Sequence, residues 1–111
     1  MIRSILGGRV RLFFSGGAPL SPQIKYFLTV VFSVNIFECY GATETAGNLS
    51  CSANWDKTSG HVGGTLGCNR MQLRDVPELN CLTDSEKPAG EIYVKGKAVM
   101  LGYFKNPQLT K

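Results

Sequence analysis

The sequence predicts an α/β fold, in which a parallel βαβ sheet piece is followed by antiparallel, barrel-like β-strands. Two apolar runs, at residues 11–14 and 34–37, flank one amphipathic segment, which is the pattern of a strand, a helix and a second strand. The second half alternates apolar and polar residues in short segments bounded by glycine, as antiparallel strands do. We expect a βαβ portion over residues 1–50 and a β-rich portion over 51–111, with the boundary in the polar stretch at 51–60.

The first strand is predicted at residues 11–14, RLFF, and runs into the loop SGGAPL at 15–20. Paired glycines in that loop leave the backbone bare enough for a planar ligand to approach. A helix should follow, because Ser21 can act as its N-cap and Pro22 suits its first position. Its core-facing residues follow the i, i+3, i+4, i+7 pattern: Ile24, Phe27, Leu28 and Val31.

The second strand, residues 34–37, leads to YGATET at 40–45, which we interpret as a turn at the carboxyl end of that strand. Tyr40 offers a flat surface for a purine, and Gly41 permits close approach. The hydroxyls of Thr43 and Thr45 can donate to phosphate oxygens, and Glu44 is a hard ligand suited to Mg²⁺. The alternative is structural, with both threonines capping the turn and Glu44 as a solvated charge.

A βαβ unit has a right-handed crossover, which would bring both loops to the same edge of a parallel sheet. The SGGAPL loop and the YGATET turn should then line one cleft. In the second half, residues 70–74, 91–95 and 99–103 are predicted strands, and the polar, breaker-rich stretch at 83–90 is a surface hairpin loop.

SGGAPL, YGATET and the later GEIYVKGKAVMLGYF, in this order and spacing, resemble the adenylate-forming enzymes, which include acyl-CoA synthetases, luciferases and the adenylation domains of peptide synthetases. The segment GHVGGTLGCN at 60–69, with DVPELN at 75–80, is most similar to the long-chain fatty acyl-CoA synthetase branch. The resemblance covers about residues 11–111. It implies that the chain is an internal fragment of the large N-terminal domain of such an enzyme.

The resemblance also implies roles for individual residues. The adenine and ribose would be bordered by residues of SGGAP, namely Gly16, Gly17, Ala18 and Pro19. Tyr40 would stack on the adenine with Glu38, Cys39 and Gly41 around it. Thr43 would contact the α-phosphate and Glu44 would bind magnesium, which makes these two the expected catalytic residues. Gly63 and Gly64 would line the passage for the acyl chain.

The reaction implied by the resemblance has two steps and uses ATP, Mg²⁺ and coenzyme A. A fatty carboxylate attacks the α-phosphorus of ATP to give acyl-adenylate and pyrophosphate, and the coenzyme A thiol then displaces AMP. The family's upstream phosphate loop, downstream ribose-binding aspartate and C-terminal lysine do not occur in this sequence, so we expect the isolated chain to be inactive. An aryl or amino acid substrate stays open.

Composition limits the other classes of function. With 111 residues, 13 glycines and 43% hydrophobic residues, the core should be thin, so we expect exposed apolar surface and self-association. The four cysteines form no CxxC pair and only His61 could join them, which argues against a zinc site and favours reduced thiols in a cytosolic compartment. His61 is expected to have a structural hydrogen-bonding role.

The apolar run from residue 26 to 37 is too short to span a bilayer, so we expect no transmembrane segment; peripheral membrane association of the parent at the cytosolic face is left open. The net charge of +4 comes from scattered basic residues. A basic module that binds nucleic acid or an anionic membrane is therefore the alternative binding hypothesis, and a purely structural β-rich piece is a third.

Overall fold

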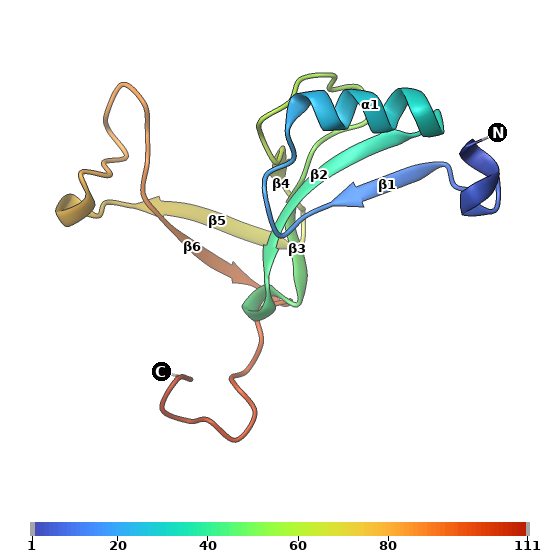
Figure 1. Ribbon diagram of the computed structural model, residues 1–111. Helices are drawn as coiled ribbons and strands as arrows, with labels where there is room; N and C mark the ends of the chain where they lie inside the picture. The colour runs from blue at the N-terminus through green and yellow to red at the C-terminus, as the bar shows by residue number, and fades with distance from the viewer. Residues whose placement is uncertain (1, 111) are drawn as a thin grey trace.

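The computed structural model describes residues 2–110, which form three arms that meet near the middle of the molecule (Figure 1). Its radius of gyration is 17.3 Å and its extents are 51 × 41 × 23 Å. A compact domain of this length would have a radius of gyration of about 13 Å. The chain is therefore extended, and most of its side chains stay in contact with solvent.

The first arm is the predicted βαβ unit. Strand β1 (Leu12–Ser15) lies parallel to strand β2 (Asn35–Ala42), with Leu12 opposite Asn35, and helix α1 (Pro22–Phe32) connects them. A short 3-10 helix at Ile2–Leu6 precedes this unit. The Ser21 side chain accepts a hydrogen bond from the backbone N–H of Ile24, and the helix ends at Ser33 in the left-handed conformation. The predicted cap and first position of the helix are confirmed.

Helix α1 covers only one face of the β1–β2 pair. On that face Phe13 packs edge-on against Phe32 with ring centroids 5.7 Å apart, and Ile36 is buried. On the other face Phe14 lies against Phe37 with ring centroids 5.4 Å apart, and Phe14 remains 62% exposed. The exposed apolar surface expected from the composition is present. Self-association through it stays a prediction.

The YGATET segment differs from the predicted turn. Tyr40, Gly41 and Ala42 belong to β2, which continues until a 3-10 turn over Thr43–Thr45 reverses the chain into β3 (Gly47–Cys51). The strand continues because β3 returns antiparallel beside it, with a bulge between Tyr40 and Gly41. Only the Thr43–Thr45 half of the motif is therefore a turn.

The four-stranded sheet is completed by β4 (Gly64–Thr65), and its strand order is β1-β2-β3-β4. Neither β3 nor β4 was predicted from the sequence. Among residues 2–110, the buried apolar side chains gather around β2 and β3: Val34, Ile36, Cys39 and Leu49. The expected division near residue 50 stays a prediction, and the first sheet extends past it to Thr65.

The second arm is a long antiparallel hairpin. Strand β5 (Asn69–Arg74) pairs with β6 (Glu91–Gly96) from the Asn69–Gly96 pair to the Arg74–Glu91 pair. The loop between them contains a 3-10 turn at Pro77–Leu79. The two predicted strands and the surface loop are confirmed. The predicted fold class, a parallel βαβ piece followed by antiparallel strands, is confirmed, and within residues 2–110 the antiparallel strands form a two-stranded sheet and no closed barrel.

The predicted strand at residues 99–103 is wrong. Val99 donates from its backbone N–H to the Gly96 carbonyl, which turns the chain directly after β6. Gly102 has a φ of 155°, and the Tyr103 N–H bonds the Thr110 hydroxyl instead of a neighbouring strand. This segment forms the third arm (Figure 1). None of the helices described in residues 2–110 combines the length and apolar character that crossing a bilayer requires.

Candidate functional site

The SGGAPL loop and the end of β2 face the same cavity, which has a volume of about 390 Å³. That volume lies in the range of ordinary small-molecule sites. The βαβ crossover accounts for the convergence, because it returns the chain to β2 with the carboxyl ends of both parallel strands at one edge. The lining comes from three segments: Ser15, Gly17, Ala18, Pro19 and Leu20; Glu38, Cys39, Tyr40 and Gly41; and Gly60, His61 and Val62.

The two glycines of the loop suit its geometry. A Cβ on Gly16 would lie 3.1 Å from the carbonyl oxygen of Cys39, so the loop packs directly on the backbone of β2. Gly17 has a φ of 87°, a backbone conformation that residues other than glycine rarely adopt. The loop therefore presents bare backbone to the cavity beside Tyr40.

Tyr40 is 37% exposed and lines the cavity, so its ring is available to a ligand. Glu38 is buried, and its Oε1 accepts a hydrogen bond from Lys25 Nζ at 2.8 Å. Lys25 also donates to the carbonyl of Thr58 at 3.0 Å, which ties helix α1 to the loop that follows β3. Glu38 thus contributes to the cavity wall while its carboxylate holds the helix.

A second cavity of about 430 Å³ adjoins the first and shares Gly17, Cys39 and Gly41 with it. It extends past Gly16 to Ala42 and Thr43 on one side and to Gly47 and Asn48 on the other. A planar group in the first cavity would therefore have room for a polar extension that leads toward Thr43.

The two threonines of the motif have different positions. Thr43 is exposed at the second cavity, whereas Thr45 is buried. The Oγ1 of Thr45 accepts from the Ala42 N–H at 3.0 Å and lies 2.9 Å from the Gly47 carbonyl oxygen. The structural interpretation is confirmed for Thr45, which caps the turn, and Thr43 keeps an accessible hydroxyl.

Glu44 is exposed and lies against the third arm. The Tyr103 hydroxyl donates to Glu44 Oε1, and the Met100 N–H donates to the Glu44 carbonyl oxygen at 2.8 Å. The hydrogen bond from Tyr103 lowers the pKa of Glu44, and the same bond raises the pKa of Tyr103. Glu44 lines a recess with residues 99–103 that is separate from the cavity at Thr43, although the two residues are adjacent in the chain.

The donor chemistry of Glu44 fits magnesium. Mg²⁺ takes hard oxygen ligands, usually one or two protein carboxylates with the remainder from water and phosphate. Residues 2–110 hold no group of three or more His, Cys, Asp or Glu side chains arranged around a common point. A magnesium ion bound by Glu44 would have to take its other ligands from phosphate oxygens and water.

Gly63 and Gly64 do not line either of these cavities. Gly63 has a φ of 68°, and a Cβ there would lie 2.1 Å from the Cys51 carbonyl oxygen. The close approach to β3 is therefore sufficient by itself to require glycine at this position. Gly64 belongs to β4, and nothing lies within 4 Å of where its Cβ would be. Their expected role in an acyl passage stays a prediction.

The cavity residues that the sequence did not suggest are in the segment after β3. His61 Nε2 lies 2.7 Å from Thr58 Oγ1, and its Nδ1 accepts from the Gly63 N–H at 3.1 Å. These bonds fix the loop and place Gly60, His61 and Val62 against the cavity. The expected structural role of His61 fits these contacts. Its position at the cavity depends on the β3–β4 pairing, which no local pattern indicated.

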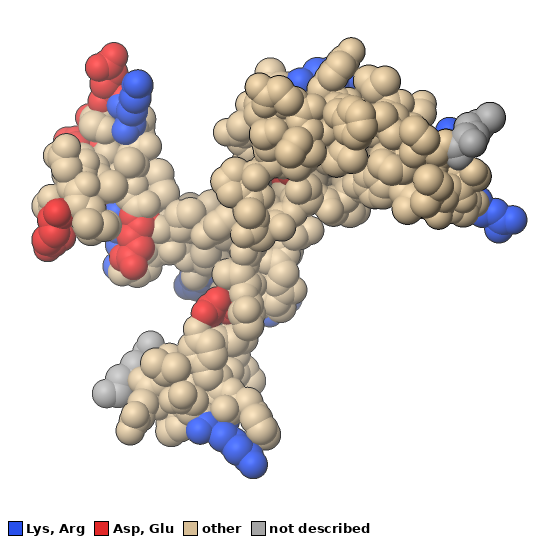
Figure 2. Space-filling view, in the orientation of Figure 1, with Lys and Arg blue, Asp and Glu red and all other residues tan. Residues whose placement is uncertain are grey.

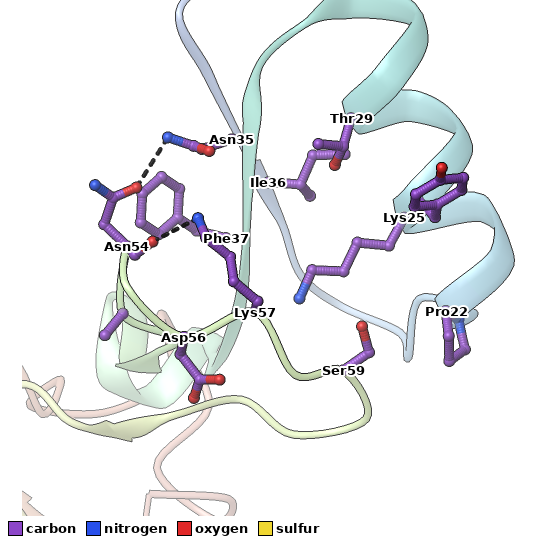
Figure 3. A pocket seen from close by; sticks show the side chains of 12 residues that line it. Pro22, Lys25, Thr29, Asn35, Ile36, Phe37, Asn54, Asp56, Lys57 and Ser59 are labelled. Atoms are coloured by element: carbon purple, nitrogen blue, oxygen red, sulfur yellow. Dashed lines mark hydrogen bonds between the residues drawn. The ribbon is translucent and has the colours of Figure 1, made fainter.

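A separate pocket of about 260 Å³ lies between helix α1, β2 and the loop at 53–59 (Figure 3). Asn35 Nδ2 donates to Asn54 Oδ1 at 2.9 Å, and Lys57 Nζ donates to the Asn54 carbonyl at 2.9 Å. Lys25, whose stem lines this pocket, reaches from the helix toward the loop (Figure 3). The motif residues Gly16, Gly17, Tyr40 and Thr43 are not part of it.

The chain is similar to known proteins over nearly its whole length. The AMP-binding enzyme family model matches residues 3–104. The chain is 41% identical to "Long chain acyl-CoA synthetase 7, peroxisomal" of Arabidopsis thaliana over 99% of its length, and 43% identical to "Fatty acyl-CoA synthetase A" of Dictyostelium discoideum over 96%. It spans 16% of the length of each of these relatives.

The chain is also similar to a solved structure, the A domain of a carboxylic acid reductase from Segniliparus rugosus in complex with AMP and a co-purified carboxylic acid. The match covers 97% of this chain and 16% of the reductase chain. The TM-score is 0.71 and the sequence identity is 34%. The arrangement of the βαβ unit, the returning β3 and the outer hairpin is therefore that of a known adenylate-forming fold. Because the family model covers most of the residues, the chain belongs to the AMP-binding enzyme family.

Proposed function

We propose that this chain is the adenylate-binding part of a long-chain fatty-acid–CoA ligase, which activates a fatty acid with ATP and transfers it to coenzyme A. The observation that supports this most strongly is the cavity shared by the bare glycine loop and Tyr40, which adjoins a second cavity at Thr43. A flat aromatic surface beside exposed backbone suits a purine, and the adjoining space leads to a hydroxyl that can donate to a phosphate.

The roles we propose combine the positions of these residues at the two cavities with the donor chemistry of Glu44. Residues Gly16 to Pro19 and Glu38 to Gly41 enclose the adenine and ribose, and Thr43 orients the α-phosphate. Glu44 holds magnesium, which supplies positive charge to the phosphates when it is bound. Catalysis would then depend on holding the fatty carboxylate in line with the α-phosphorus and on stabilising the charge that develops there.

Two comparisons support the choice of substrate. The Arabidopsis and Dictyostelium relatives are named as synthetases of long-chain or fatty acyl-CoA, and the solved A domain contains AMP with a carboxylic acid. A carboxylate, ATP and coenzyme A are therefore the substrates we propose for the whole protein. Gly63 and Gly64 remain the residues that we propose for the wall of the acyl passage.

The test is Glu44→Gln in the full-length protein that carries this chain, measured by pyrophosphate exchange across a range of magnesium concentrations. The variant should exchange more slowly and require more magnesium, because the carboxamide is neutral and a poorer ligand. Glu86→Gln is the matched control, since Glu86 is exposed in the β5–β6 loop. Exchange by Glu44→Gln that equals the control in rate and magnesium requirement would refute the role of Glu44.

The alternative of a basic binding module receives no support from the surface. Lysine and arginine side chains are dispersed over the three arms on the face that Figure 2 shows, without a continuous stripe. A phosphate-backbone surface would need such a stripe, and its affinity would fall steeply with salt. Salt-dependent binding of DNA that Tyr40→Ala leaves unchanged would favour that alternative over a nucleotide cavity.

A further inference from the structure

Cys39 and Cys51 form a pair of facing thiols. They are opposite each other in the antiparallel β2–β3 ladder, and their Sγ atoms are 2.8 Å apart. Both are free cysteines; Cys39 is buried and Cys51 is partly exposed. The pairing of β2 with β3 thus holds two thiols in contact, and one of them, Cys39, directly precedes Tyr40 in the chain.

The geometry of this pair is compatible with a disulfide. Residues directly opposite in an antiparallel ladder have Cα atoms about 4.5–5.5 Å apart, and disulfides span Cα separations of about 4.4–6.8 Å. An S–S bond is about 2.05 Å long, so the two sulfur atoms need to approach by only about 0.8 Å. The register of β2 and β3 can therefore persist when the bond forms.

The other two cysteines are in a different situation. Cys68 directly precedes β5, and Cys81 lies beyond its other end, where it is bridged to Val76. A six-residue strand is about 20 Å long, so these thiols cannot meet while the hairpin is folded. The fold therefore separates Cys68 from Cys81 and places Cys39 and Cys51 in contact.

We propose that Cys39 and Cys51 are an oxidation site, at which hydrogen peroxide converts the two thiols to a disulfide that joins β2 to β3. The Cys51 thiolate attacks one peroxide oxygen, the O–O bond breaks and hydroxide leaves, which gives a sulfenic acid on Cys51. The Cys39 sulfur then attacks the Cys51 sulfur, and the S–O bond breaks with release of water. Overall, two thiols and one peroxide give one disulfide and two waters.

The surroundings of the two sulfur atoms decide which of them reacts first with the peroxide. Burial, followed by the hydrogen bond with Cys51, raises the pKa of Cys39 to about 12, so this thiol stays protonated at neutral pH. Cys51 is the more exposed of the two and meets the oxidant first. Cys39 is then the resolving thiol, held in contact by the sheet. The bond would lie beside the cavity that Cys39 lines, and its formation does not depend on the proposed function.

The experiment exposes the folded, reduced chain to hydrogen peroxide, blocks the remaining thiols and digests with trypsin and a Glu-specific protease. Cleavage after Glu38, Glu44 and Lys57 separates Cys39 from Cys51, and cleavage at Arg70, Glu78 and Glu86 isolates Cys68 from Cys81. Mass spectrometry should find the Cys39–Cys51 linkage as the dominant disulfide, at least about tenfold above any other pairing. The C68S/C81S variant should give the same linkage with the same yield.

Denaturant provides the internal control. Cys39 and Cys51 are 12 residues apart, and Cys68 and Cys81 are separated by nearly the same length of chain, so loop closure is equally probable for both pairs in the unfolded state. In urea the two linkages should form in similar amounts, and the preference for Cys39–Cys51 should disappear. Similar amounts of the two linkages in the folded chain, or no Cys39–Cys51 linkage, would overturn the proposal.

Discussion

Substituting Gly41 with alanine tests how tightly β2 and β3 pack at the site. A Cβ on Gly41 would lie 1.8 Å from the carbonyl oxygen of Gly47 and 2.6 Å from its carbon. Both contacts involve backbone, so no side-chain rotation relieves them. The two strands would have to separate by more than an ångström at the bulge, where Gly41 pairs with Asn48 and Ala42 with Gly47.

The expected cost follows from those contacts. Overpacking costs about 1–3 kcal/mol, and each ladder hydrogen bond that is lost adds about 1 kcal/mol. We therefore expect the β2–β3 hairpin to be destabilised by about 3 kcal/mol, which corresponds to a roughly 100-fold increase in local opening. Because Gly41 lines both cavities, AMP affinity should fall as well.

The assay is amide hydrogen exchange of the β2–β3 hairpin, together with AMP titration. Gly67→Ala is the matched control, because Gly67 is exposed and nothing lies within 4 Å of where its Cβ would be. The hairpin amides should exchange roughly 100-fold faster in Gly41→Ala than in Gly67→Ala. Equal exchange rates in the two variants would refute the packing argument.

Two further predictions concern charge and protonation. Lys25→Met should lower the free energy of unfolding by about 3 kcal/mol in urea, because it leaves the buried Glu38 carboxylate without its cation. Adding Glu38→Gln to Lys25→Met should recover most of that loss. A double variant as unstable as Lys25→Met alone would contradict the ion-pair account. Stability should also fall as the pH rises from about 9 to about 12. Burial raises the pKa of Cys39 from its usual 9.0 to about 12, so over this range the unfolded chain binds fewer protons than the folded chain. Cys39→Ser should reduce that loss, and an unchanged pH dependence in this variant would exclude Cys39 as its cause.

Local patterns were sufficient for the βαβ unit. The apolar spacing of the helix, its Ser21 cap and Pro22 specify α1 without reference to distant residues, and the crossover rule then brings both loops to one edge. The same reasoning predicted β5 and β6, whose alternation is clear. It also predicted that the loop with Gly16 and Gly17 lies beside the segment from Tyr40 to Thr43. These residues line the two adjoining cavities.

Pairings between distant residues were not predictable in this way. Strand β3 begins with Gly47 and Asn48, residues with low strand propensity, and it forms because β2 offers a partner. The β-branched and aromatic residues at 99–103 favoured a strand, but contacts of Met100 and Tyr103 with Glu44 hold this segment in turns. His61 was placed at the cavity by the same non-local pairing of β3 with β4.

The most direct test of the central claim is AMP titration by calorimetry into the full-length protein that carries this chain, with Tyr40→Ala and Tyr26→Ala compared. Tyr26 is exposed on α1 and lines the separate pocket, so it controls for loss of an aromatic ring elsewhere. Stacking of a base on an aromatic ring contributes about 1–3 kcal/mol, so Tyr40→Ala should weaken AMP binding about tenfold or more. Tyr26→Ala should leave the affinity unchanged. Equal AMP affinity in Tyr40→Ala and the unsubstituted protein would contradict an adenine site between the glycine loop and β2.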